Sequence, residues 1–335
     1  MKHYLVVIDD EICPRSVGEL CGKNMEAWKV ENGLCIPDHP PFYSQTHGTV
    51  CASLAGEFLA EWKLVGISTG GQGNTQVENV CTALEWCGQA GAAMVCMSMG
   101  VTCGMGLERM SDVTRTLQET GCQIFCACSN DGKLTFPAAY PWVTGVTFDP
   151  SIQGVLRTDS RWGCDVAVGP FPSRVLDKLA QRNGFFHRRT NSLTVAYAAS
   201  RVLRAGGVEH LPAMKREGFV PSVKEAFQKW EKPVVKVGHS REKWESLLGW
   251  LEKESYWPVL LTSQEPTDWS KMTAGVENLE EAAALLPLLK EVGILFLDLP
   301  EEGPKVWDFE LDLASFETEE AYCRIVEFFG EEETP

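Results

Sequence analysis

The feature that most constrains the fold of this chain is an alternation of short apolar runs with longer amphipathic segments. Residues 4–8 (YLVVI) and 92–98 are apolar runs of strand length, and residues 47–60 between them have a helical pattern. Short, wholly apolar runs are typical of strands in parallel sheets that are covered by helices. The sequence therefore predicts an α/β fold, a parallel sheet with helices on both faces.

The alternation continues to about residue 205, and a second set of elements follows. Further strands are expected at 63–68, 122–128 and 142–148, and further helices at 74–90, 107–120 and 192–205. After the glycines at 206–207, strands are expected at 233–237, 257–262, 294–299 and 305–312, and helices at 241–254, 279–291 and 317–329. We expect two domains, residues 1–207 and a smaller α/β domain at 208–335.

The charge of the chain is concentrated in the second of these domains. The whole chain carries 46 acidic and 30 basic side chains, a net charge of −16. Residues 1–207 hold 19 acidic and 17 basic side chains, a net of −2, and residues 208–335 hold 27 and 13, a net of −14. This balance argues against a nucleic-acid binder. The acidic domain either keeps the protein soluble or binds a basic segment of a substrate or partner.

The thirteen cysteines are expected to be reduced and mostly buried. Their number is odd, the chain is long, and no secretory signal or CxxC pair is found. No apolar run is long enough to cross a membrane. We therefore expect a cytoplasmic protein without disulfides, metal site, cofactor or membrane contact.

Polar residues follow three of the predicted strands. Asp9, Ser98 and Asn130 each come directly after or near the end of an apolar run. Functional groups gather at the carboxyl ends of the strands in open parallel sheets. The acidic cluster at Asp9 also resembles the start of a response-regulator receiver. That alternative is excluded because residues 50–58 contain no aspartate and no lysine lies between Lys63 and Lys133.

Six sequence blocks make the functional interpretation specific. They are LVVIDDEI around Asp9, HGTVCASLAG from His47, VCMSMG around Ser98, ACSNDG around Asn130, FPAAYPWVTGV from Phe136 and TNSLTVAYAAS around Ser192. In this order, over residues 4–205, the chain resembles the subtilisin-like serine protease family, in which aspartate, histidine and serine follow one another along the chain. The acidic region after residue 207 resembles no family that we recognise.

The resemblance implies a role for each polar residue. Ser192 would be the nucleophile and His47 the base that takes its proton. Asp9, rather than its neighbour Asp10, would orient the imidazole. Asn130 and the backbone N–H of Ser192 would donate hydrogen bonds to the oxyanion, helped by a helix that begins near Ser192.

The resemblance also implies where a peptide binds. Ser98, Met99 and Gly100 would pair with the substrate as an added strand. Ala127, Cys128 and Ser129 would line the other wall of the primary pocket, and Asp131 at its rim would favour a basic side chain.

Several positions depart from the family pattern. Thr190-Asn191-Ser192 stands where the family has Gly-Thr-Ser, Ala196 replaces a proline, Ser129 replaces a glycine, and Val50 replaces a frequent histidine. The stretch after the His47 helix is too short for the family's calcium-binding insertion, so no calcium site is expected. Residue 4 already begins the first strand, so no propeptide is expected, which suits an intracellular enzyme.

We therefore expect an intracellular serine endopeptidase that cleaves a dedicated peptide or protein precursor through an acyl-enzyme. Two alternatives remain. The chain could bind peptide without cutting it, or it could be a peptide ligase or macrocyclase in which an amine intercepts the acyl-enzyme.

Overall fold

The computed structural model describes most of the chain, in two compact units. The described residues are 4–40, 44–70, 76–102, 106–158, 163–183, 190–214, 222–238, 241–254, 256–300, 303–313 and 315–330. The units are Met1–Arg216 and Glu217–Pro335. Leu211 is part of the core of the first unit, and the N–H of Met214 donates to the carbonyl of Arg157 at 2.7 Å. The segment after residue 207 thus packs with the first unit, and the units divide at 216 rather than at 207.

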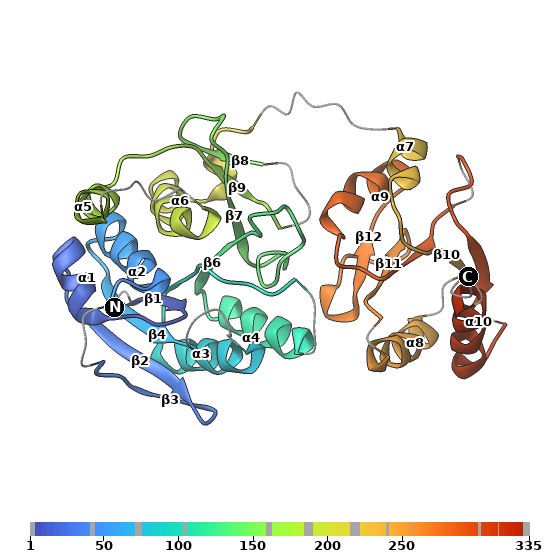
Figure 1. Cartoon of the computed structure of the whole chain (residues 1–335), viewed down its shortest axis with the longest axis horizontal. Coiled ribbons are helices and arrows are strands. Elements are labelled where there is room, and N and C mark those ends of the chain that lie inside the picture. Colours follow the sequence, from blue (N-terminus) through green and yellow to red (C-terminus); the bar gives the residue numbers. More distant parts are fainter. Residues whose placement is uncertain are drawn as a thin grey trace. The chain divides into compact units, whose positions relative to one another are not determined.

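The first unit is built on a nine-stranded sheet with the order β3-β2-β4-β1-β5-β6-β7-β9-β8 (Figure 1). The strands are β1 (Tyr4–Asp9), β2 (Met25–Glu31), β3 (Leu34–Pro37), β4 (Lys63–Ser68), β5 (Met94–Met97), β6 (Gln123–Ala127), β7 (Thr144–Phe148), β8 (Val155–Arg157) and β9 (Val166–Val168). Neighbouring strands are parallel except at the two edges, where β3 and β8 run antiparallel to β2 and β9.

Helices cover both faces of this sheet (Figure 1). One face carries α1 (Pro14–Cys21), α2 (His47–Phe58), α5 (Arg174–Asn183) and α6 (Asn191–Ala205), and the other carries α3 (Val77–Ala90) and α4 (Leu107–Glu119). Strand β1 is apolar on both faces because both are covered: Leu5 and Val7 join the core under α2 and α6, and Val6 and Ile8 are equally buried. The predicted α/β fold with helices on both faces is confirmed.

The second unit is a smaller α/β structure, also as predicted. Its five parallel strands have the order β12-β11-β13-β10-β14. They are β10 (Val234–Gly238), β11 (Pro258–Thr262), β12 (Thr273–Gly275), β13 (Ile294–Asp298) and β14 (Phe309–Asp312), accompanied by α7 (Val223–Gln228), α8 (Arg241–Lys253), α9 (Leu279–Leu285) and α10 (Thr318–Gly330).

Some elements differ from the sequence-based expectation. The helix expected at 279–291 ends at Leu285 and passes into a 3-10 turn, because Pro287 cannot donate a helical hydrogen bond. The strand expected at 305–312 is confined to Phe309–Asp312. The hairpin of β2 and β3 was not expected, although the Asn32-Gly33 pair, with φ angles of 52° and 73°, is the usual signal for such a turn. Several short elements were also not expected from the sequence. They are strands β8, β9 and β12, helices α1, α5 and α7, and the 3-10 turns Val208–His210 and Trp269–Lys271.

Twelve of the thirteen cysteines lie in the described residues, and all twelve are thiols rather than disulfides. None of the described helices combines the length and the apolar character needed to cross a membrane.

Gly48 allows the start of α2 to lie against the end of β1. A Cβ atom at Gly48 would be 2.8 Å from the Cβ of Asp9 and 2.8 Å from the carbonyl oxygen of Glu11. Real Cβ atoms do not approach so closely, and the backbone atoms here cannot move aside cheaply. The missing side chain therefore sets the distance between β1 and the first turn of α2.

We expect Gly48→Ala to lower the free energy of unfolding by about 1–3 kcal/mol, because the added methyl group overpacks this contact. Gly88→Ala is the control: a Cβ there meets only Leu117, at 3.8 Å, on an exposed helical surface. Alanine favours the helix, so this variant should be as stable as the wild type or more so. Urea denaturation of both variants measures the difference, and equal stability would contradict the tight contact at Gly48.

Candidate active site

The sheet order brings three predicted residues to one edge. β1, β5 and β6 are neighbours, so Asp9 at the end of β1, Ser98 after β5 and Asn130 after β6 lie at the same carboxyl edge. Two helices begin at this edge. His47 is the first residue of α2, and Ser192 is the second residue of α6.

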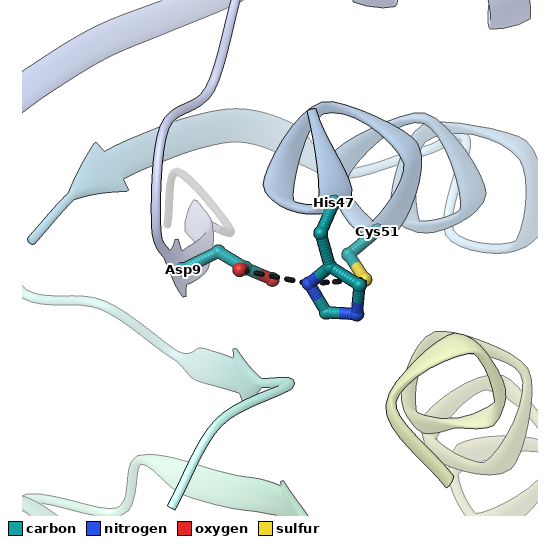
Figure 2. Close-up of side chains that lie close together, drawn as sticks. All are labelled: Asp9, His47 and Cys51. Atoms are coloured by element: carbon teal, nitrogen blue, oxygen red, sulfur yellow. Dashed lines mark hydrogen bonds and ion pairs between the residues drawn. The ribbon is translucent and has the colours of Figure 1, made fainter. Parts of the chain in front are cut away.

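Asp9, His47 and Ser192 form a continuous hydrogen-bonded relay. Nδ1 of His47 lies 3.0 Å from Oδ1 of Asp9, and Nε2 lies 3.0 Å from Oγ of Ser192. Asp9 and Ser192 are 1% and 8% exposed, and the imidazole is 42% exposed. The carboxylate of Asp9 faces the ring of His47 (Figure 2). His47 lies 38 positions after Asp9 and 145 positions before Ser192, so only the fold brings the three residues together.

The two neighbouring aspartates have different partners. Oδ2 of Asp9 accepts a hydrogen bond from the hydroxyl of Ser98, and Oδ1 of Asp9 accepts one from the backbone N–H of Asp10 at 2.8 Å. Asp10 instead accepts the N–H of Gly48 at 2.9 Å and caps the start of α2. Burial and the nearby Asp9 raise the pKa of Asp10. Asp9 is therefore the carboxylate that meets the imidazole, and Asp10 fixes the helix that carries it.

The surroundings of His47 stabilise a positive charge on its ring. The hydrogen bond with Asp9, and next the contact with Cys51, raise the pKa of His47 above its ordinary value of 6.5. Asp9 thus stabilises the positive charge that the ring would acquire on taking a proton from Ser192.

Cys51 is a neighbour that sequence reasoning missed. Its side chain lies beside the ring of His47 (Figure 2), with Sγ 3.8 Å from Nε2. The same Sγ lies 3.9 Å from the carbonyl oxygen of Ser192. The four-residue spacing from His47 on a helix could have indicated this contact. Single donor atoms of Asp9, His47 and Cys51 lie within 4.8 Å of one another. Both ring nitrogens already face protein oxygens, so a metal ion would have to displace one of these contacts.

The first turn of α6 presents Ser192 to the relay. Thr190 is the N-cap, and its carbonyl oxygen accepts the N–H of Leu193 at 3.2 Å. The hydroxyl of Thr190 lies 2.9 Å from Oγ of Ser192. When Ser192 donates its single proton to His47, Thr190 donates to Ser192. Thr190 therefore adds a contact to the proposed nucleophile.

Asn191 ties α6 to the ends of β6 and β7. Its Oδ1 accepts the N–H of Phe148 at 2.8 Å, and its Nδ2 donates to the carbonyls of Cys128 and Ser129, both at 2.9 Å. Its own N–H donates to Oδ1 of Asn130 at 3.0 Å. Because Oδ1 of Asn130 accepts this hydrogen bond, the exposed part of the Asn130 side chain that can donate a hydrogen bond is its NH₂ group. The sequence showed Asn191 only as a departure from the family pattern.

Ser98, Met99 and Gly100 line a pocket of about 420 Å³ beside Asp9 and His47. The rest of its described lining is Asp10, Val80, Met97, Val101, Met110, Phe136 and Pro137. Most of these side chains are apolar, so the pocket suits an apolar side chain of an extended peptide.

The residues predicted for the second wall are mostly buried. Ala127 and Cys128 are 5% and 8% exposed, Ser129 is partly exposed, and none of the three is among the pocket's lining residues in the described part of the chain. Asp131 is exposed and forms an ion pair with Lys133 at 3.1 Å. That neighbouring lysine already offsets the charge that was expected to select a basic side chain.

Comparisons with known proteins give structural similarities only. No family model and no curated protein matches the chain. A lanthipeptide protease structure is 11% identical, with a TM-score of 0.47 over 62% of this chain and 73% of that one. The prenylagaramide maturation protease is 15% identical, with a TM-score of 0.39 over 85% and 93%.

A third similar structure is the epidermin leader peptide processing serine protease from Staphylococcus aureus. It is 11% identical, with a TM-score of 0.45 over 60% of this chain. This chain covers 64% of it, less than two thirds of its length. Because these TM-scores are below 0.5, we base the function on the side chains of this protein.

The raised pKa of His47 can be tested through Asp9. In the wild type the proton on His47 stabilises the fold fully below pH 6.5, and this contribution is lost as the pH rises through the raised pKa. In Asp9→Asn the pKa of His47 should fall, and the pH-dependent part of this stabilisation should shrink. NMR titration of His47, with urea denaturation across pH, measures both.

Asp112→Asn, an exposed change on α4, is the control and should leave the His47 titration as in the wild type. A His47 titration that is the same in Asp9→Asn and in the wild type would contradict the pairing.

Asn191→Ala should lower the free energy of unfolding by about 2 kcal/mol or more, because it leaves the half-buried N–H of Phe148 and two carbonyls without their partner. Asn79→Ala is the matched control, since within the described residues the Asn79 side chain makes one hydrogen bond, to the carbonyl of Thr69 at 2.9 Å. It should cost about 1 kcal/mol. Urea denaturation that gives equal losses for the two variants would refute the anchoring role of Asn191.

Proposed function

We propose that this chain is a subtilisin-like serine endopeptidase that cleaves peptide bonds through an acyl-enzyme on Ser192. The observation that carries the proposal is the relay itself, with 3.0 Å contacts on both ring nitrogens of His47. A serine hydroxyl is a weak nucleophile unless a base lies within hydrogen-bond reach, and a third group orients that base. Asp9, His47 and Ser192 meet both conditions.

In the proposed reaction, Oγ of Ser192 attacks the carbonyl carbon of the substrate, and its proton passes to Nε2 of His47. The negative charge then develops on the former carbonyl oxygen. Nδ2 of Asn130 and the N–H of Ser192 donate hydrogen bonds to it, and the start of α6 adds a favourable partial charge. His47 gives the proton to the departing amine, and water later cleaves the ester by the reverse sequence of proton transfers.

The substrate is proposed to be a dedicated peptide or protein precursor, bound in extended form along Ser98, Met99 and Gly100. The apolar pocket beside these residues supports selection of an apolar side chain near the scissile bond. Ala127, Cys128 and Ser129 are proposed for the opposite wall. The acidic second unit is proposed either to keep the protein soluble or to bind a basic segment of the substrate or a partner.

Labelling with a fluorophosphonate probe tests the nucleophile. The wild type should be labelled at Ser192, and Ser192→Ala should not, as mass spectrometry of the digested protein will record. Asn130→Ala should keep the relay but lower kcat by about 10²–10³, because one oxyanion donor is lost. Ser263→Ala, in the second unit, should be labelled like the wild type.

A wild type that is folded but resists the probe as Ser192→Ala does would refute the protease and favour a protein that binds peptide without cutting it. If the wild type reacts with the probe, its digestion of a peptide library distinguishes a protease from a ligase or macrocyclase. Hydrolysis adds one water to the products, whereas a ligase or macrocyclase would give products without it.

A further inference from the structure

Cys128 and Cys164 form a close thiol pair outside the relay. Their Sγ atoms lie 3.2 Å apart, with Cys164 donating to Cys128. Cys128 in turn donates to the carbonyl of Gly163 at 2.9 Å. Among the twelve described thiols this is the pair with a direct Sγ–Sγ contact. The two residues are 36 positions apart, so the fold and not the local sequence creates the pair.

The backbone around this pair is shaped for a close approach. Cys128 follows β6 and Cys164 precedes β9, and β7 lies between these strands. Gly145 of β7 has no side chain, and a Cβ there would be 1.6 Å from the carbonyl oxygen of Gly163. The missing side chain lets the segment before β9 lie over β7.

We propose that Cys128 and Cys164 are a dithiol site that is oxidised reversibly to a disulfide by a low-molecular-weight disulfide. A disulfide bond is about 2.05 Å long, so the two sulfur atoms need to move closer by only about 1 Å. Cys164 is the thiol that an oxidant meets first, because it is partly exposed while Cys128 is 8% exposed.

The exchange proceeds in two balanced steps. The thiolate of Cys164 attacks one sulfur of the oxidant, forms a mixed disulfide and releases one small thiolate. The thiolate of Cys128 then attacks Sγ of Cys164, closes the internal disulfide and releases the second. The two protons lost by the protein end on the two small thiols, and the two electrons reduce the oxidant.

The site is placed to affect cleavage, and this consequence rests on the proposed function. The carbonyl of Cys128 accepts Nδ2 of Asn191, and Asn130 lies two residues further along. A shift of about 1 Å at Cys128 would therefore move the segment that carries the proposed oxyanion donor. Displacements of this size reduce catalysis strongly, so we expect the disulfide to lower kcat/KM about tenfold or more.

The experiment uses the full chain with Cys323→Ser, which removes an exposed thiol of the second unit. After incubation with excess oxidised glutathione and alkylation of remaining thiols, peptide mapping should find Cys128 linked to Cys164. Fragmentation of the linked peptides must distinguish Cys128 from Cys122 and Cys126. Cleavage of a peptide substrate should weaken with oxidation and recover with reductant. Cys164→Ser in the same background should show neither the link nor the change.

The possible results separately test the dithiol site, its effect on cleavage and the proposed protease activity. Absence of the link, or glutathione attached to Cys164 without closure, overturns the dithiol site. A complete link with unchanged kcat/KM overturns its effect on cleavage. If the link forms in a protein that neither cleaves peptides nor reacts with the fluorophosphonate probe, the dithiol site stands and the proposed protease fails.

Discussion

The anchoring of α6 on the carboxyl ends of β6 and β7 is the contact on which the candidate site depends. Asn191 makes this contact with both ends of its amide and with its backbone N–H. The same residue precedes Ser192 and orients Asn130. One buried amide therefore fixes the proposed nucleophile relative to the proposed oxyanion donor. In a parallel sheet no hydrogen bond of the ladder could do this, since the ladder joins strands and not helix ends.

A second close contact, between the start of α2 and the end of β1, positions His47 relative to Asp9. Gly48 lets α2 begin directly beside the end of β1, and Asp10 caps that beginning by accepting the N–H of Gly48. His47 is thereby held against Asp9. The adjacent carboxylates of Asp9 and Asp10 thus serve one arrangement: the first pairs with the imidazole and the second holds its helix. The proposed dithiol pair includes Cys128 at the end of β6, whose carbonyl accepts a hydrogen bond from Asn191.

Much of the fold could be predicted from the sequence because both faces of the large sheet are covered. Strands such as β1 are then apolar throughout, and short apolar runs stand out between amphipathic helices. Most of the missed elements lie at or next to a sheet edge or on the surface, and the buried strand β9 is only three residues long. β2, for example, is mostly half-buried and carries Glu26, Lys29 and Glu31 among its apolar residues, so no apolar run marks it.

The sequence by itself determined the fold class and the set of polar residues at the strand ends, because these depend on local runs of residue types. It could not determine which side chains touch. The amide contacts of Asn191 and the sulfur pair of Cys128 and Cys164 depend on distances between segments far apart in the chain. Those distances follow from strand order and from glycines that let backbones approach, and only the tertiary structure decides them.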